Sequence, residues 1–148
     1  MTTRASIAPD DLLSNRILIV APHMDDEVLG CGGIMHMHTD KTQIHCIYAT
    51  DGARSPAPLL PWTGSIDPDI RERRRQEAMA AMDDVGIPRE NSIFLDFPDG
   101  KLMKNALPFK VRMAEHLARI EPAIILVPFR YDLHPDHVAA HRGVRDAV

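Results

Sequence analysis

Cysteine is scarce in this chain of 148 residues. The two cysteines, Cys31 and Cys46, form neither a C-x-x-C pair nor a disulfide framework, so we interpret both as small buried hydrophobic residues. No apolar stretch approaches the roughly 20 residues that cross a bilayer, and the N-terminus has no apolar segment of the kind that directs secretion. We therefore expect a cytoplasmic location and no membrane partner.

Positive charge is not in excess either, because 21 acidic residues outnumber 17 lysines and arginines and the net charge is −4. Such a chain lacks the broad basic surface that binds nucleic acids or anionic membranes. Apolar residues make up 45% of the chain and charged residues 26%, which is ordinary for a globular protein. We expect residues 1–148 to form one domain that acts on a small molecule, as a monomer or as a homo-oligomer.

Four apolar segments of strand length alternate with segments of helical pattern. The predicted strands are residues 16–21, 44–50, 92–97 and 123–129, and the predicted helices are residues 27–38, 71–87, 107–120 and 137–148. The first and last strands are apolar without alternation, which is typical of strands covered on both faces. This order predicts an α/β sandwich built on a parallel sheet.

Helical periodicity also predicts which residues each long helix buries. In the predicted helix 71–87 the buried stripe is Ala78, Met79, Met82 and Val85. In the predicted helix 107–120 it is Val111, Ala114 and Leu117.

The loop 51–69 is long and carries four prolines and the only tryptophan. Loops of this length are usually binding loops or lids, and its apolar residues Leu59, Leu60 and Trp62 favour that interpretation. A plain surface insertion is the alternative.

Two charged motifs follow the first and fourth predicted strands. They are PHMDDE (residues 22–27) and RYDLHPDH (residues 130–137). Ligands of open α/β sheets bind beyond the carboxyl ends of the strands, so these side chains are placed to act rather than to pack. Together they offer nitrogen and oxygen ligands suited to Zn²⁺ or another divalent first-row metal: His23, Asp25, Asp26, Glu27, Asp132, His134, Asp136 and His137.

Each motif also has a purely structural interpretation. Asp25 or Asp26 could be the N-cap of the next helix, and Pro135 with Asp136 could form the turn that starts the last one. Three consecutive acids cannot all be caps, however, and their mutual repulsion favours a nearby cation. The presence of both motifs at one sheet edge therefore favours a metal site.

A nucleotide-binding loop is not indicated. Gly30, Gly32 and Gly33 form GCGG rather than G-x-G-x-x-G, and they fall inside the predicted helix 27–38. We interpret these glycines as sites of close packing between that helix and the sheet.

The segments APHMDDEVLGCGG (residues 21–33) and HPDHVAAH (residues 134–141) resemble the two signature motifs of the PIG-L family, also called LmbE-like. They occur in the family's order and separation, and weaker similarity in RRQEAMAAMDDVGI and FLDFPDGKL extends the resemblance over nearly the whole chain. The resemblance implies a Rossmann-like three-layer sandwich with a mostly parallel sheet. It also implies a zinc-dependent hydrolase that removes N-acetyl groups from N-acetylglucosamine-type substrates.

The metal ligands are not defined by spacing alone, because His141 follows His137 by one helical turn and shares its face. The resemblance implies that His23, Asp26 and His137 bind the zinc and that His141 does not. The fourth position would be open to water and to the carbonyl group of the substrate.

The resemblance also implies the catalytic roles. Asp25 would be the general base, and His134 would stabilise the oxyanion and help to protonate the departing amine. Asp136 would hold and tune His134. Because a nearby carboxylate favours the cation, we expect Asp136 to bias His134 toward its protonated form.

Three further residues are candidates for contact with the substrate. Arg74 could meet a phosphate or carboxylate, Asp99 could hold sugar hydroxyls, and Tyr131 could assist catalysis. Arg71 and Arg75, beside Arg74, could meet such a group too, although arginines on an exposed helix face are by default solvated charges.

The chain departs from the family pattern in two respects. Met24 stands where the family usually has proline, a change that removes no ligand. Family members also usually continue past the second motif, so we expect the usual C-terminal part to be lacking. Competing interpretations are the removal of another acyl or carbamoyl group, and a metal-bound fragment without catalytic activity.

Overall fold

The structure, a computed structural model, describes residues 8–54 and 68–148, so Leu59, Leu60 and Trp62 of the predicted binding loop lie outside the described residues. The strands are β1 (Ile17–Ala21), β2 (Ile44–Thr50), β3 (Ser92–Phe97) and β4 (Ile124–Leu126). The α-helices are α1 (Pro9–Ser14), α2 (Asp26–Met37), α3 (Pro68–Val85), α4 (Ala106–Ile120) and α5 (Pro135–Arg145). Short 3₁₀ helices occur at Lys41–Gln43, Arg89–Asn91 and Leu102–Asn105. Across the two described ranges, no helix is both long enough and apolar enough to span a bilayer.

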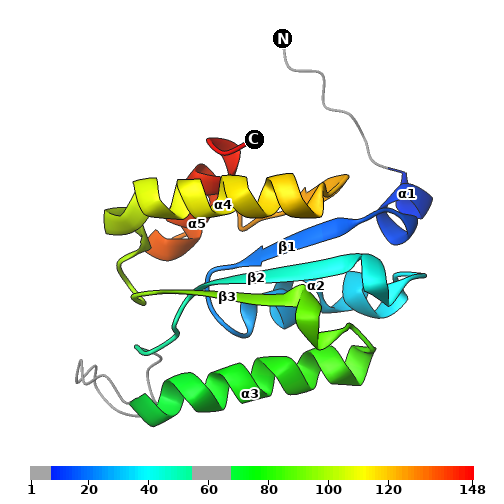
Figure 1. The fold of residues 1–148 in the computed structure, drawn as a ribbon, viewed down its shortest axis with the longest axis horizontal. Coiled ribbons are helices and arrows are strands. Elements are labelled where there is room, and N and C mark those ends of the chain that lie inside the picture. Colours follow the sequence, from blue (N-terminus) through cyan, green and yellow to red (C-terminus); the bar gives the residue numbers. More distant parts are fainter. Residues whose placement is uncertain (1–7, 55–67) are drawn as a thin grey trace.

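The four strands form one parallel sheet in the order β3-β2-β1-β4. Helices α4 and α5 cover one face of the sheet, and α2 and α3 cover the other (Figure 1). This confirms the predicted three-layer α/β sandwich. Because all pairs are parallel, the carboxyl ends of the strands lie at one edge of the sheet.

The core lies on both faces of the sheet because β1 is buried along its whole length. Alternate residues of the strand point to opposite faces. The face toward α2 and α3 contains Ile17, Ile19, Met35, Ala78 and Met82. The face toward α4 and α5 contains Leu18, Val20, Phe109, Met113 and Ala140. A strand covered in this way has no solvent-facing position, which explains why the sequence of β1 is uniformly apolar.

The last strand is shorter than predicted. The sequence indicated residues 123–129, whereas β4 spans Ile124–Leu126, with Leu126 opposite Ile19 of β1. Pro128, two residues further on, has no N–H group to donate to a ladder. The apolar residues beyond β4 therefore belong to a loop that leads into the site.

Helix α4 buries a different face from the one predicted. Val111 is about half exposed, whereas the buried residues are Phe109, Met113, His116 and Ile120. The predicted stripe is therefore wrong for Val111 and for the exposed Ala114, whereas Leu117 does pack against the core. A histidine in the buried stripe concealed it, because periodicity was judged from apolar residues alone.

The glycines of α2 do not have the packing role expected of them. A Cβ atom added at Gly30 or Gly33 would meet no atom of the described residues within 4 Å, and one at Gly32 would meet only a side chain of the same helix. The expected close approach is therefore wrong. A close approach occurs instead in α5, where a Cβ on Gly143 would lie 2.4 Å from Cδ1 of the buried Phe109.

We predict opposite effects for alanine at two helical glycines. Gly143→Ala should lower the free energy of unfolding by about 1–3 kcal/mol, because the added methyl group overpacks the contact between α5 and Phe109. Gly33→Ala, in open space on α2, should raise it by up to about 1 kcal/mol through helix propensity. Urea unfolding of both variants checks this, and equal shifts in the two would contradict the packing explanation.

Candidate metal centre

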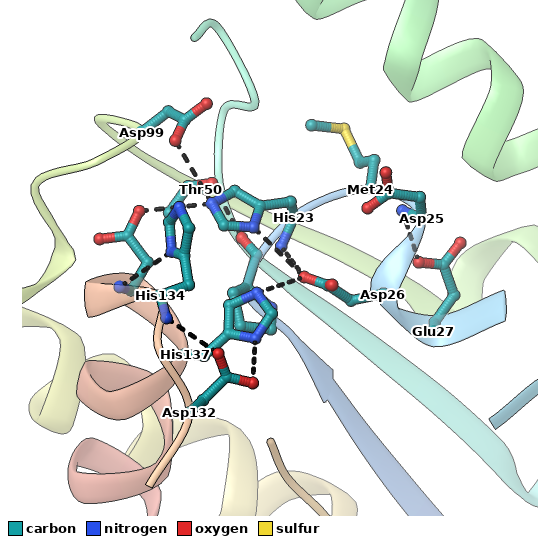
Figure 2. A network of polar contacts seen from close by, with 12 residues as sticks. His23, Met24, Asp25, Asp26, Glu27, Thr50, Asp99, Asp132, His134 and His137 are labelled. Carbon is teal, nitrogen blue, oxygen red and sulfur yellow. Dashed lines mark hydrogen bonds and ion pairs between the residues drawn. The ribbon is translucent and has the colours of Figure 1, made fainter. Parts of the chain in front are cut away.

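The fold brings the two charged motifs together at the carboxyl edge of the sheet. Strands β1 and β4 are neighbours, so residues 22–27 and 130–137, which follow these strands, lie side by side. The loop after β3 adds Asp99, which is buried. Three parts of the chain that are far apart in sequence thus surround one histidine, His23 (Figure 2).

Asp26 lies between His23 and His137. Its Oδ2 atom is 3.3 Å from Nδ1 of His23 and 3.3 Å from Nε2 of His137. The backbone N–H of His23 also donates to this oxygen, at 2.9 Å. The structure therefore brings together the three residues expected to bind zinc.

The outer nitrogens of both histidines face carboxylates. Nε2 of His23 lies 3.3 Å from Oδ1 of Asp99 and 3.4 Å from Oδ2 of Asp136. Nδ1 of His137 lies 3.1 Å from Oδ2 of Asp132. Metal-binding histidines typically have their second nitrogen held by a carboxylate in this way, which directs the other nitrogen toward the metal.

His134 is also close to this cluster. Ligand atoms of His23, His134 and His137 lie within 4.8 Å of one another. The same holds for His23, Asp99 and Asp136. His141 has a different partner, because its Nδ1 lies 3.0 Å from the carbonyl oxygen of Pro128.

Carboxylates determine the protonation of His23. Burial lowers the pKa of His23, but hydrogen bonds with Asp136, Asp26 and Asp99 outweigh burial and raise the pKa to about 11. Burial raises the pKa of each of these three carboxyls, yet contacts that include His23 keep each pKa below its ordinary value. The cluster is thus built around a positive charge.

A divalent cation fits this donor set. Three carboxylates around one imidazole carry more negative charge than a single proton balances, and the donors are the nitrogen and oxygen types that zinc binds. Binding would require His23 to release its proton, because only a neutral imidazole nitrogen is a ligand.

Asp136 does not have the partner expected of it. Its carboxylate is fully buried, contacts His23 and accepts the backbone N–H groups of Gly100 at 2.7 Å and Leu102 at 3.0 Å. Only its backbone meets His134, whose Nδ1 accepts the N–H of Asp136 at 3.2 Å as the N-cap of α5. Burial and the charge of His23 hold the pKa of His134 below its ordinary value. The charge of Asp136 raises the pKa of His134, as expected, but burial and the charge of His23 outweigh that effect.

Asp25 lies outside the cluster, on the side of His23 away from His134 in the view of Figure 2. Its side chain is 55% exposed. Its backbone has φ 145°, a strained conformation for a residue with a side chain. The buried carboxylate of Glu27 accepts the N–H of Asp25 at 3.0 Å, and Arg74 donates to Oδ2 of Asp25 at 2.9 Å.

The three candidates for substrate contact lie in different surroundings. Asp99 is buried, where it contacts His23 and accepts the N–H of Arg54 at 2.8 Å. The side chain of Arg74 is only 13% exposed and forms an ion pair with Asp25. Tyr131 is exposed at the rim, with the guanidinium group of Arg130 over its ring.

One supporting residue was missed in the sequence. Asp51 follows β2 as the site residues follow β1, β3 and β4, and it is buried. Its Oδ1 accepts the N–H groups of Asp99 at 3.1 Å and of Ala53 at 3.2 Å, and its Oδ2 pairs with Arg71. A charge placed directly after an apolar strand was the signal that could have identified it.

An apolar groove of about 390 Å³ adjoins the cluster. Asp26, Asp132 and His137 line one part of it. The remainder is formed by the ends of β1 and β4 and by α2, including Leu29 and Cys31. Cys31 is therefore only partly buried, unlike Cys46.

Together, the parallel sheet and the histidine–carboxylate cluster at its carboxyl edge define an α/β protein whose site suits a divalent cation. A family model described as PIG-L, GlcNAc-PI de-N-acetylase, matches residues 18–148. The chain therefore belongs to the PIG-L family of enzymes, as its two motifs predicted.

Individual relatives are similar to this chain in sequence or in fold. The chain is 28% identical over 125 residues to 4-oxalmesaconate hydratase from Pseudomonas putida strain KT2440, covering 80% of this chain and 46% of the relative. The conserved protein TT1542 from Thermus thermophilus is 29% identical, with TM-score 0.67 over 90% of this chain and 55% of that one. N,N′-diacetylchitobiose deacetylase from Pyrococcus horikoshii shares the fold, with TM-score 0.69 and 21% identity over 91% of this chain and 49% of that one. The chain spans about half the length of these relatives.

We predict that removing either histidine next to Asp26 abolishes metal retention. His23→Ala and His137→Ala should each lose bound zinc, because each substitution removes a nitrogen beside the shared oxygen. Metal analysis after dialysis against a weak chelator measures this.

His141→Ala is the matched control, because His141 lies one turn further along α5 and contacts a backbone carbonyl instead. It should retain zinc at the wild-type level. Loss of zinc in His141→Ala together with retention in His137→Ala would reverse the assignment.

Proposed function

We propose that this protein is a zinc-dependent hydrolase that removes an N-acetyl group from an amino sugar or its conjugate. The observation that carries the proposal is the pair of histidine nitrogens that share Oδ2 of Asp26, beside an exposed carboxylate, Asp25, that takes no part in the cluster. The family description and the deacetylase with the same fold support the choice of reaction.

In this proposal His23, Asp26 and His137 hold the metal. A zinc ion bound there would lower the pKa of its water ligand from 15.7 toward about 7 and polarise the acyl oxygen. Asp25 accepts the proton of the attacking water, because its carboxylate is exposed, adjacent in sequence to Asp26 and free of the cluster.

His134 acts on the other side of the acyl group. Its Nδ1 accepts a backbone N–H, so the neutral ring carries its proton on Nε2 and can donate it to the developing oxyanion. The proton that Asp25 has taken from water then passes to the amine as the carbon–nitrogen bond breaks.

The remaining assignments follow from burial. We assign Tyr131, exposed at the rim, to contact with the substrate. Asp99 and Asp136 are buried against His23, and we assign both to orienting that ligand.

Addition of water to a carbon–carbon double bond is a second candidate, because the relative from Pseudomonas putida is named as a hydratase. Hydration would use the same activated water and the same base. It differs in the substrate, an unsaturated acid instead of an amide, and releases no amine.

The test is to measure product release by the metal-loaded protein from two panels, one of N-acetylated amino sugars and one of unsaturated dicarboxylic acids. Each assay is repeated after metal removal with a chelator and after zinc is restored. Amine release that the chelator abolishes and zinc restores supports the deacetylase. Zinc-dependent hydration without amine release would replace it with the second candidate.

We predict that Asp25→Asn retains zinc and loses most turnover. The amide cannot accept the proton from water, and loss of a general base typically costs about 10²- to 10⁴-fold in rate. Asp84→Asn makes the same change on the exposed surface of α3 and should leave both quantities unchanged. Near-normal turnover in Asp25→Asn would remove Asp25 from the mechanism.

A further inference from the structure

Asp25 needs support from other parts of the chain. Its backbone lies in a strained region at φ 145°, and its side chain is more than half exposed. A strained and exposed residue keeps one conformation only where its surroundings impose it. Two side chains do so here. Glu27 accepts the backbone N–H of Asp25, and Arg74 donates to the carboxylate of Asp25 and to the carbonyl oxygen of Met24.

We propose that Arg74 is a positioning residue that holds Asp25 for proton transfer, an inference that rests on the proposed hydrolase function. One nitrogen of Arg74, Nη2, donates both to Oδ2 of Asp25 at 2.9 Å and to the carbonyl oxygen of Met24 at 2.7 Å. A single guanidinium nitrogen thus ties the carboxylate to the peptide that precedes it. Within the described residues Oδ1 of Asp25 accepts no hydrogen bond, so the second oxygen is available to take a proton.

The surroundings of Arg74 fix its side chain. Arg74 belongs to α3, and its side chain is only 13% exposed, although much of that helix faces solvent. A Cβ atom at Gly52 would lie 2.7 Å from Cε of Met24 and 3.4 Å from Cδ of Arg74. Gly52, whose φ of +60° also favours glycine, therefore leaves the space that the Arg74 stem and the Met24 methyl group occupy.

The neighbouring arginines show that α3 does not present a free cationic surface at this edge. Arg71 pairs with Asp51 at 3.0 Å, and Arg75 pairs with Asp96 at 2.6 Å. Arg71 and Arg75 thus each have a carboxylate of their own on a strand or loop of the sheet. Arg74 differs in that its carboxylate is the proposed base, which favours a positioning role over capture of a phosphate on the substrate.

The experiment compares Arg74→Ala, Arg74→Lys and Arg73→Ala on an uncharged N-acetylated amino sugar, which offers no anion for an arginine to bind. We expect kcat of Arg74→Ala to fall about 10- to 100-fold, the cost of a base misplaced by about 1 Å, with KM within twofold and zinc content unchanged. Added guanidinium ion should restore part of kcat, and Arg74→Lys should keep more activity than Arg74→Ala. Arg73, exposed on the same helix, is the control, and its variant should match the wild type.

Coupling between the two residues gives a second measurement. If Arg74 acts through Asp25, the double variant Asp25→Asn/Arg74→Ala should be no slower than Asp25→Asn alone. A raised KM with unchanged kcat would instead make Arg74 a substrate ligand and overturn the inference. Additive losses in the double variant, or unchanged kinetics in Arg74→Ala, would also overturn it.

Crystal structures separate this inference from the proposed function. Should the wild type release no amine, the proposed function fails, and the position of Asp25 in wild-type and Arg74→Ala crystals still decides the inference. We expect the carboxylate of Asp25 to shift or lose order in the variant. An unchanged Asp25 would overturn the positioning role.

Discussion

The site depends on the balance of charge around His23. Asp26, Asp99 and Asp136 come from α2, from the loop after β3 and from α5, and their carboxylates meet on one imidazole ring. Like charges repel at these separations, so the three segments converge only around a positive charge. Asp136 extends the connection, because it also accepts two backbone N–H groups from the loop after β3. The same contacts therefore join separate parts of the fold and prepare the site for a cation.

The sheet provides the framework that opposes this repulsion. β1 is buried on both faces, and its pairing with β2 and β4 fixes where residues 22–27 begin. Burial of apolar area at about 25 cal/mol per Å² stabilises the two layers of helices against the sheet, and this stability holds the acidic residues close to one another. Charge follows directly after an apolar strand because the carboxyl edge is where a packed sheet opens to ligands.

The periodicity of apolar residues predicted the layered fold and the bounds of three of the four strands to within one residue. The position of the two charged motifs at strand ends predicted that these motifs meet. The same two signals could not predict contacts between polar residues that are distant in sequence. His116 on the buried face of α4 hid the true stripe, because a polar residue breaks an apolar pattern even where it is packed. Asp136 was assigned to its sequence neighbour His134, whereas its carboxylate contacts His23 across the sheet edge. Local motifs identify chemical groups, but only the crossing of strands and loops determines which groups meet.

The deacetylation that we propose and the hydration that is its alternative would place the same first demands on this cluster, namely an activated water, a base and a donor for developing negative charge. The residues proposed to meet these demands are tied to the fold: His23 contacts three carboxylates, and His137 contacts two. The rim is constrained far less, since Phe129 and Leu133 are largely exposed and Leu29 faces the adjoining groove. Substitutions at the rim leave packing and charge balance intact, whereas substitutions in the cluster disturb both. A cluster held by the fold beside a loosely constrained rim lets substitutions alter which substrate fits without altering the groups that act on it.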